Sequence, residues 1–500
     1  MLWKAACAWL AAVFLAGPAR AADEIHWTFT GPTSVAIDWR GAGSGVRYGI
    51  TIAYGSIANG ETPSPLPFSS PGPFWEAALT GLEPATTYHY SVDGGPDHVF
   101  RTPPAPGESF TVYVEGDIGD SSSYSRMGAV QKLIADGGAA FVLVVGDLTY
   151  GNAHGQPCVD NHFNNVMKWS QDAGYMPAWG NHEWDGSTDD LRNYKGRFAL
   201  PNPQGSPGSP SAGCCGEDWS WFDAGNTRFI SYPEPYPGAW PDWNTRAKAL
   251  MDAAEANPSI QFIVTFGHRP AYSTGHHAGN STLRSYLDAL GASHSKYVLN
   301  LNGHSHDYER TFPQYGVTHV TVGIGGSTLE ESSPPCLYGT CPAPPWSAYR
   351  CFHHGALRLR FTPSAIQGEA LCGPPGDSGS NLNDVQCSPG DVMDAFLIGA
   401  DARTDSPPAP AGERLSIESV TPNPSRSPLR VAYSLPEDAP AFLELVDLAG
   451  RRWLRRDMGS AGRGHHETSL ALDGLPGPGV FWLHLAQARQ HTVSKLIFIR

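Results

Sequence analysis

Hydrophobic residues in the middle of the chain form short runs, and each run ends beside a glycine and a polar residue. The five clearest runs are FTVYVEGD (110–117), FVLVVGDLTY (141–150), MPAWGNHE (176–183), QFIVTFGH (261–268) and YVLNLNGHSH (297–306). Apolar runs of this length predict buried strands. The amphipathic stretches YSRMGAVQKLIADG (124–137) and WNTRAKALMDAAEANP (243–258) predict helices between them.

On both sides of this segment the pattern changes to a period of two. Stretches such as VAIDW and TYHYSVDG near the N-terminus, and LRVAYSLP and GVFWLHLA near the C-terminus, predict half-buried strands. Proline-rich TPPAPG (102–107) and TDSPPAPAG (404–412) predict linkers. We therefore expect an α+β chain with a β-sandwich at 24–103, a mixed segment at 108–402, a linker at 403–412 and a second β-sandwich at 413–500.

Charge and the N-terminal segment limit the partners. The formal net charge of −15 argues against nucleic acid or an anionic membrane surface as a general partner. An anionic ligand would therefore need a local positive site. Residues 1–21 contain an early lysine, an apolar stretch too short to span a bilayer and small residues before Ala21, which predicts a signal peptide and no stable membrane span. We expect a secreted, periplasmic or cell-surface protein.

Cysteine usage fits export. Nine cysteines are present, and eight remain once Cys7 is removed with the signal peptide. An even number in an exported chain favours disulfides. The cysteines that lie close together in the sequence, Cys214/Cys215 and Cys336/Cys341/Cys351, are expected to cross-link loops. A zinc site is the rival interpretation, although no spacing resembles a paired zinc knuckle.

The polar residues at the ends of the five apolar runs form a candidate metal site. Ligands bind beyond the carboxyl ends of parallel strands, so these ends are expected to converge. The candidate donors are Asp117, Asp147, Tyr150, Asn181, His268, His304 and His306. Carboxylate, phenolate, amide and imidazole groups suit iron, manganese or zinc. Seven donors exceed the needs of one tetrahedral ion, which favours two ions sharing a carboxylate. The phenolate favours Fe(III).

The ordered blocks GDIG, GDLTY, GNHE, GHRP and GHSH are similar to the signature blocks of the purple acid phosphatases, within the calcineurin-like metallophosphoesterases. The resemblance implies a four-layered α/β/β/α sandwich flanked by two immunoglobulin-like sandwiches. It also implies that Asp117, Tyr150 and His306 hold Fe(III), and that Asp147 bridges to a divalent ion (Zn, Mn or Fe) completed by Asn181, His268 and His304. Most relatives outside the purple branch place a histidine at the position of Gly119, and Tyr150 would take over that coordination.

The same resemblance implies hydrolysis of small phosphate monoesters by a metal-bound hydroxide. His182 would contact the phosphate and His277 would protonate the leaving group, with His276 as the alternative donor. We expect Asp307 and Asp120 to orient the ligands, and His353 and His354 to be structural.

Two other functions stay open. One is phosphodiesterase or nucleotidase action on the same metals, with bases stacked on the tryptophan-rich loops around Trp219, Trp221, Trp240 and Trp243. The other is a cell-surface binding protein that retains the metal fold only as a scaffold.

The flanking segments carry weaker resemblances. LEPATTYHYSV resembles the tyrosine corner of immunoglobulin-like and fibronectin type III domains, in which the hydroxyl of Tyr88 would pin a strand crossing. The C-terminal segment looks like the sorting modules of type IX secretion cargo, which implies the secretion machinery as a partner. A plain surface-binding module is the alternative.

Overall fold

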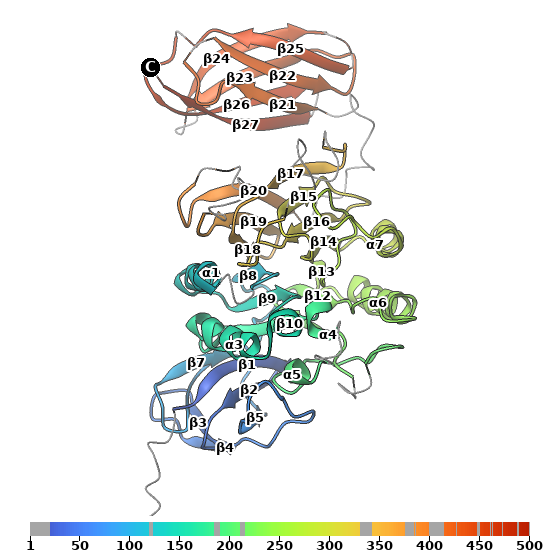
Figure 1. The fold of residues 1–500 in the computed structure, drawn as a ribbon. Coiled ribbons are helices and arrows are strands. Elements are labelled where there is room, and N and C mark those ends of the chain that lie inside the picture. Colours follow the sequence, from blue (N-terminus) through green and yellow to red (C-terminus); the bar gives the residue numbers. More distant parts are fainter. Residues whose placement is uncertain are drawn as a thin grey trace, which may run out of the picture. The chain divides into compact units, whose positions relative to one another are not determined.

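The protein is described by a computed structural model (Figure 1). The structure describes residues 21–119, 124–184, 191–210, 216–330, 343–375, 385, 387–399, 415–426, 428–447, 451–460, 462, 464–472, 474–487 and 490–499. The chain divides into a larger unit that extends to residue 403 and a smaller unit made mainly of residues from 404 onward. The predicted signal peptide and the predicted linker at 403–412 lie outside the described residues, apart from Ala21.

Two mixed sheets form the centre of the larger unit. The six-stranded sheet has the order β10 (Gly174–Ala178), β9 (Phe141–Val145), β8 (Phe110–Glu115), β18 (Gly355–Phe361), β19 (Ala365–Cys372), β20 (Val392–Gly399). The seven-stranded sheet has the order β11 (Trp221–Ala224), β12 (Thr227–Ser231), β13 (Phe262–Phe266), β14 (Tyr297–Asn302), β16 (Thr318–Val322), β15 (Tyr308–Thr311), β17 (Ser347–Cys351). Strands β8, β9 and β10 run parallel, as do β12, β13, β14 and β16.

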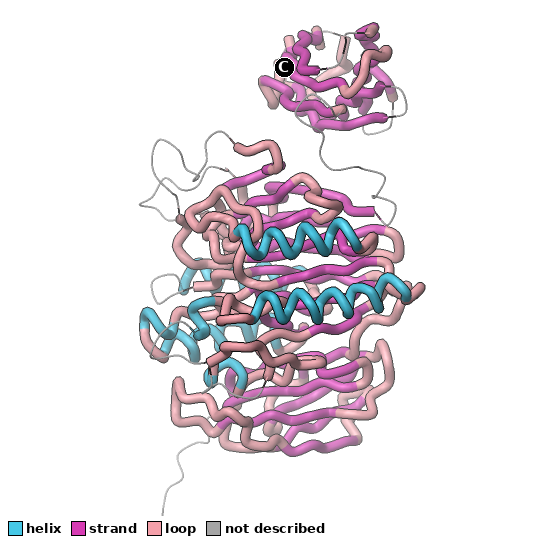
Figure 2. The backbone as a smooth tube through the Cα atoms, turned by 90° about the vertical axis from the view of Figure 1, so that its right-hand side faces the viewer, coloured by secondary structure: helices cyan, strands magenta, loops and turns pink. Residues whose placement is uncertain are grey.

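Helices cover the outer faces of both sheets, giving four layers (Figure 1). The helices of the unit are α1 (Tyr124–Gly137), α2 (Gly151–His154), α3 (Pro157–Ser170), α4 (Asn181–Trp184), α5 (Arg192–Lys195), α6 (Ala239–Ala256) and α7 (Ser281–Ser293). Helices α1 and α3 lie on the six-stranded sheet, whereas α6 and α7 run over the seven-stranded sheet (Figure 2). The mixed α+β class is thus confirmed.

The unbroken apolar run of β9 follows from this layering. Phe141, Leu143 and Val145 face the core between the two sheets, whereas Val142 and Val144 pack under α1 and α3. A strand covered on both faces has no polar side.

Two small sheets precede the two large sheets in the same unit. One is β1 (Asp23–Gly31), β2 (Ser34–Arg40), β5 (Phe74–Leu79), and the other is β4 (Ser56–Asn59), β3 (Gly45–Gly49), β6 (Thr87–Val92), β7 (His98–Arg101). Their core is continuous with the core between the large sheets, and the rings of Phe29 and Phe141 lie 5.5 Å apart. The hydroxyl of Tyr88 accepts a hydrogen bond from the backbone N–H of Glu83 at 2.8 Å, the contact expected of a tyrosine corner. The immunoglobulin-like or fibronectin type III class of this region stays a prediction.

Buried ion pairs join the small sheets to the helical layer and loops around the six-stranded sheet. The guanidinium of Arg197 donates to Glu24 at 2.9 Å, and both side chains are at most 2 % exposed. Arg40 on β2 donates to Asp160 on α3 at 2.5 Å. The N-terminal sheets therefore share both apolar and polar contacts with the rest of the larger unit.

The smaller unit contains two antiparallel sheets. One is β21 (Ser416–Thr421), β22 (Leu429–Leu435), β25 (Gly464–Leu470), and the other is β24 (Arg452–Gly459), β23 (Ala441–Asp447), β26 (Gly479–Gln487), β27 (Gln490–Phe498). Leucines at alternating positions of β22, β23 and β26 meet in one core. The sorting role and the immunoglobulin-like class of this unit stay predictions.

The cysteine predictions are only partly addressed by the described residues. A disulfide joins Cys372 and Cys387, a pair that the sequence did not single out. Cys214, Cys215, Cys336 and Cys341 lie outside the described residues. Within the described part of the chain, none of the helices is both long and apolar enough to traverse a lipid bilayer.

Candidate metal centre

The polar residues predicted as ligands follow the carboxyl ends of parallel strands from both large sheets. Asp117 and Asp147 come two residues after β8 and β9, and Asn181 comes three residues after β10. His268 comes two residues after β13. His304 comes two residues after β14, and His306 follows two residues later. Because the two sheets pack face to face, these strand ends meet above one edge of the shared core.

Two groups of buried side chains are close enough to hold metal ions, and Asp147 belongs to both. Asp147, His268 and His304 have donor atoms within 4.8 Å of one another, and so have Asp117, Asp147 and His306. The Nε2 atom of His268 lies 3.1 Å from Oδ2 of Asp147. The Nε2 atom of His306 lies 3.3 Å from Oδ1 of Asp117. The arrangement suits two neighbouring ions with one shared carboxylate.

Tyr150 and Asn181 each join one of these groups. The hydroxyl of Tyr150 is 3.1 Å from Nε2 of His306, on the Asp117 side. The side-chain oxygen of Asn181 is 3.2 Å from Nε2 of His268, on the other side. All seven predicted ligands are thus brought together, in the two sets that the family resemblance implies.

The backbone at three of these positions is strained. Asp117, Asp147 and His304 have φ angles of 53°, 47° and 69°, in the left-handed region that costs a side-chain-bearing residue free energy. Such strain persists only where surrounding contacts enforce it, and it is concentrated at functional sites. Its presence at three convergent donors supports a functional role for the cluster.

Glycine is required beside Asp147. A Cβ atom on Gly180 would lie 2.2 Å from Oδ1 of Asp147 and 2.4 Å from its backbone nitrogen. The glycine of the GNHE block therefore makes room for the carboxylate that both groups share.

Glu183 fixes the two loops that meet at Asp147, a role that the sequence analysis did not assign. Its buried carboxylate accepts hydrogen bonds from the backbone N–H groups of Gly180 at 2.7 Å and Asp147 at 2.9 Å. Burial and then the charge of Asp147 raise its pKa well above the usual value. The signal was present in the sequence, because Glu183 is the last residue of the quoted GNHE block.

The ligand histidines and carboxylates polarise one another strongly. Burial alone would lower the pKa of His268, but the charge of Asp147 raises it to about 10. His306 behaves in the same way, since Asp117 overcomes burial and raises its pKa to about 9. In the absence of metal the imidazole rings of His268 and His306 are therefore protonated. A bound cation would replace the proton on the ligating nitrogen of each ring.

Backbone carbonyls and an arginine orient the imidazole rings. His268 donates from Nδ1 to the carbonyl of Val145 at 3.0 Å, and His306 donates from Nδ1 to that of Thr328 at 2.7 Å. Both rings thus direct Nε2 toward the cluster, which is how outer contacts usually fix metal-binding histidines. Arg269 donates to Nε2 of His304 at 2.6 Å, and burial, His268 and Arg269 lower the pKa of His304, which keeps it neutral.

Asp307 does not supply these contacts. Its carboxyl group is fully buried, and burial raises its pKa to about 8, so it carries a proton at neutral pH. The expectation that Asp307 orients His268 or His306 is therefore replaced by the carbonyl contacts. Asp120 lies outside the described residues.

A cavity of about 320 Å³ opens onto the cluster. Its walls include Asp147, Tyr150, Asn181, His182, His277, His304, His306 and Glu330. Nδ1 of His182 donates to Oδ1 of Asn152 at 2.7 Å, and burial lowers the pKa of His182. The ring of His277 stacks on that of His304 with centroids 4.0 Å apart. His276 is not among the lining residues, so the geometry favours His277 of the two.

Glu330 is a second residue that the sequence analysis missed. Its Oε2 atom lies 3.4 Å from Nε2 of His277 and 3.7 Å from Nδ1 of His306. Although burial would raise it, the neighbouring His277 and His306 lower the pKa of Glu330, which is therefore ionised. No motif marks this residue, because it reaches the site only after folding.

The tryptophan-rich loops are not placed for base stacking. Trp219, Trp240 and Trp243 are at most 6 % exposed, and none of them lines the cavity. The indole N–H groups of Trp240 and Trp243 donate to the backbone carbonyls of Pro233 and Ser231. Trp221 lies under the guanidinium of Arg228 at 4.7 Å. These rings are packing residues, which corrects the suggestion that they bind a nucleobase.

Comparison with known proteins assigns the segment that carries these strand ends. Residues 110–308 match the family profile described as calcineurin-like phosphoesterase. The chain carries a calcineurin-like metallophosphoesterase domain.

Relatives that match more than half of the chain include acid phosphatases. A human (Homo sapiens) protein named acid phosphatase type 7 is 24 % identical over 408 residues, covering 69 % of this chain and 86 % of its own. An Arabidopsis thaliana protein named probable inactive purple acid phosphatase 27 is 25 % identical, covering 58 % of this chain and 54 % of its own. The metallophosphoesterase domain thus has purple acid phosphatase homologues.

A solved structure supports the same fold. Purple acid phosphatase PPD1 from yellow lupin superposes with a TM-score of 0.55 at 20 % identity, covering 76 % of this chain and 74 % of its own. At this identity the likeness concerns the fold alone.

The residues present fit the two metal ions of this enzyme family. Oδ1 of Asp117 is buried, and its contact with Nε2 of His306, at 3.3 Å, is too poorly aligned to be a hydrogen bond. A buried carboxylate oxygen that lacks a well-formed hydrogen bond is costly, and a bound cation would satisfy it. The donors are oxygen and nitrogen atoms without sulfur, as hard to borderline ions require.

Proposed function

We propose that this protein is a hydrolase of small phosphate monoesters that works with two metal ions at the candidate centre. The observation that carries the proposal is the pair of buried donor groups that share Asp147 at the floor of the cavity. Asp117, Tyr150 and His306 would hold one ion, and Asn181, His268 and His304 the other. Bound ions of this kind lower the pKa of a coordinated water and neutralise phosphate charge.

Fe(III) is the ion we propose for the side that contains Tyr150. Burial, followed by the charges of Asp117 and Asp147, raises the pKa of this phenol well above its usual value. Only a strongly positive neighbour would remove the phenolic proton there. A trivalent ion meets that requirement better than a divalent one. For the other side we propose Zn, Mn or Fe in the divalent state.

Two histidines of the cavity wall would take part in binding and cleaving the ester. His182 and His277 both line the cavity that opens onto the cluster. We propose that His182 contacts a phosphate oxygen and that His277 donates a proton to the departing alkoxide. Glu330, 3.4 Å from Nε2 of His277, would hold that ring in position.

The test is an Asp147→Ala variant together with a substrate panel. Because Asp147 belongs to both groups, the variant should lose both ions and phosphate release should fall by at least about a thousandfold. Elemental analysis and a panel of monoesters, diesters and nucleotides make the measurement. Asp136→Ala, at an exposed position on α1, is the matched control and should keep metal and activity.

Each outcome separates the candidate functions. Full metal content in Asp147→Ala would refute the shared ligand. Faster turnover of diesters or nucleotides than of monoesters would replace the monoesterase with the alternative. If the wild-type protein binds two ions but hydrolyses no ester of the panel, the result would favour a binding protein that retains the metal scaffold.

We also propose export, with the protein secreted, periplasmic or at the cell surface and the secretion machinery engaged through the C-terminal unit. The proposal rests on the signal-like residues 1–21 and on the Cys372–Cys387 disulfide, which is typical of oxidising compartments. Cell fractionation of the native host would test it, and retention of the mature chain in the cytosol would contradict it.

A further inference from the structure

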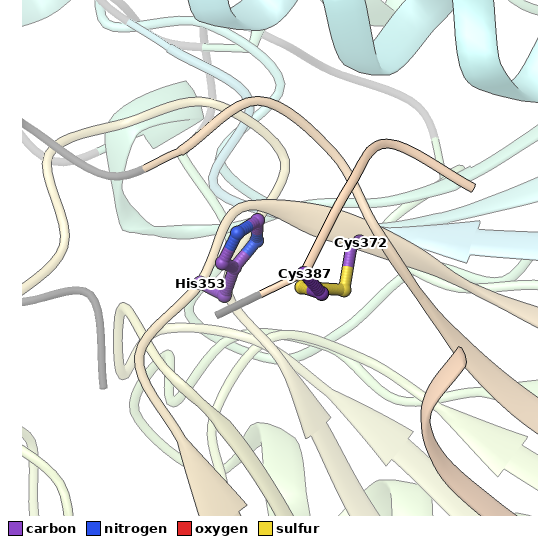
Figure 3. Close-up of side chains that lie close together, drawn as sticks. All are labelled: His353, Cys372 and Cys387. Carbon is purple, nitrogen blue, oxygen red and sulfur yellow. A yellow bond between two sulfur atoms is a disulfide. The ribbon is translucent and has the colours of Figure 1, made fainter. Parts of the chain in front are cut away.

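A histidine lies against the Cys372–Cys387 disulfide, outside the candidate metal centre (Figure 3). His353 is in the segment between β17 and β18, Cys372 ends β19, and Cys387 precedes β20. A ring nitrogen of His353 and the two sulfur atoms all lie within 4.8 Å of one another. His353 and Cys372 are fully buried, whereas Cys387 is partly exposed.

The ring of His353 is oriented as in a metal ligand. Its Nδ1 lies 2.7 Å from the carbonyl oxygen of His354. A carbonyl only accepts, so Nδ1 carries the proton and a neutral ring has its lone pair on Nε2. Nε2 is buried and has no hydrogen-bond partner among the described residues. Leaving a buried acceptor unsatisfied costs about 1–3 kcal/mol, so this atom points to a missing ligand.

Backbone hydrogen bonds hold His353 and Cys372 together independently of the disulfide. The carbonyl of His354 that orients His353 also accepts from the N–H of Gly373, next to Cys372, at 2.6 Å. Cys372 donates to the carbonyl of Asp391 and accepts from Gly390, both at 2.8 Å. Opening the disulfide would therefore leave His353 and Cys372 in place.

We propose that His353, Cys372 and Cys387 form a binding site for a thiophilic divalent cation of the zinc class when the disulfide is reduced. A dithiol reductant would transfer two electrons and two protons, which breaks the S–S bond, gives two thiols and leaves the reductant as a disulfide. Cys387 is the accessible sulfur for that attack. Binding of the cation then releases the two thiol protons, and two thiolates with Nε2 of His353 provide three ligands of a tetrahedral ion. Water takes the fourth position.

The site differs in chemistry from the phosphoesterase centre. It shares no residue with the seven oxygen and nitrogen donors there, and its thiolates prefer softer ions. The sequence analysis treated zinc as the rival interpretation of the cysteines and His353 as structural. The structure combines these separate observations, because it places His353 beside two cysteines that are 15 residues apart.

The test titrates Cd²⁺ into the full chain before and after treatment with a phosphine reductant. Reduced protein should bind one more Cd²⁺ than oxidised protein at this site, with a sulfur-to-cadmium charge-transfer band in the ultraviolet. Cys372→Ser/Cys387→Ser should lack that increment, which also subtracts the contribution of other thiols. His353→Gln should weaken the extra binding by about tenfold or more. His319→Gln, at an equally buried histidine of β16, is the matched control and should bind as wild type.

Identical stoichiometry and band in reduced wild type and the double serine variant would overturn the proposal. Equal affinity in His353→Gln and wild type would also overturn it, and would leave Cys372 and Cys387 as a structural disulfide. If the double serine variant does not fold, His353→Gln decides the question, because it keeps both cysteines.

Discussion

Asp147 is the residue on which the proposed chemistry depends most. Its side chain lies 3.1 Å from His268, its Oδ1 accepts from the backbone N–H of His182 at 2.9 Å, and its own N–H is held by Glu183. Burial would raise the pKa of Asp147, but His268 and His182 lower it, so the carboxylate is ionised. A rigid, ionised carboxylate in a left-handed backbone conformation is well suited to bridge two cations.

The role of Tyr150 can be tested by the visible absorption of the iron-loaded protein. Tyr150→Phe removes the phenol and should abolish the visible charge-transfer band of iron-loaded protein, because no other predicted ligand gives a phenolate. The absorption spectrum makes the measurement. Tyr175→Phe removes another buried hydroxyl, 2.7 Å from His162, and should keep the colour. An unchanged spectrum in Tyr150→Phe would reject the iron–phenolate assignment.

At this scale the sequence reveals ligands better than their supporting residues. Asp117 and His268 are recognisable because each follows a buried apolar run. Glu330 lies outside every quoted block, and Arg269 lies inside the GHRP block, but their contacts with His277 and His304 arise only when separate loops fold together. Short motifs do not encode such contacts, so sequence reasoning passed over them.

Among the elements, the ends of parallel strands place the site. Strands β8, β9 and β10 of one sheet and β13 and β14 of the other end at the same edge. The period and length of the apolar runs predicted these strands correctly. The pairing of β18, β19 and β20 beside β8 was not predicted, since strand order depends on contacts between distant segments.

The close packing of the strand ends gives an element-scale prediction. Gly180→Ala should displace the Asp147 carboxylate, because the new methyl group would lie 2.2 Å from Oδ1. We expect metal content and phosphate release to fall by at least about tenfold, with the fold retained. Elemental analysis and activity make the measurement. Gly45→Ala, where no atom lies within 4 Å of the added group, is the matched control, and full metal content in Gly180→Ala would contradict the argument.

At the scale of the whole molecule, the N-terminal sheets and the two large sheets belong to one unit. The sequence predicted a β-sandwich at 24–103 and a mixed segment at 108–402 with a proline-rich connection, and this division into domains stays a prediction. The sequence did not predict that their cores are continuous, because this depends on which faces of β1 and β9 meet.

Arg197 provides the test of this union. Arg197→Met removes one of the two guanidinium groups beside the buried Glu24, the other being Arg40 at 3.0 Å, and should lower the free energy of unfolding by about 2–3 kcal/mol. Urea denaturation measures the loss. Arg101→Met breaks the more exposed pair with Glu108 and should cost at most about 1 kcal/mol. Equal effects in the two variants would show that the buried pair has no special weight.

The contact between Phe29 and Phe141 has a consequence for shortened versions of the protein. A chain trimmed to begin at residue 108 would keep every proposed metal ligand but would lose Phe29, whose ring packs against both Phe141 and Phe222. The two rings would be exposed to water, and exposed apolar surface favours association with other copies of the chain. Preparations that lack the N-terminal sheets are therefore expected to aggregate, since these sheets cover apolar surface of the two large sheets.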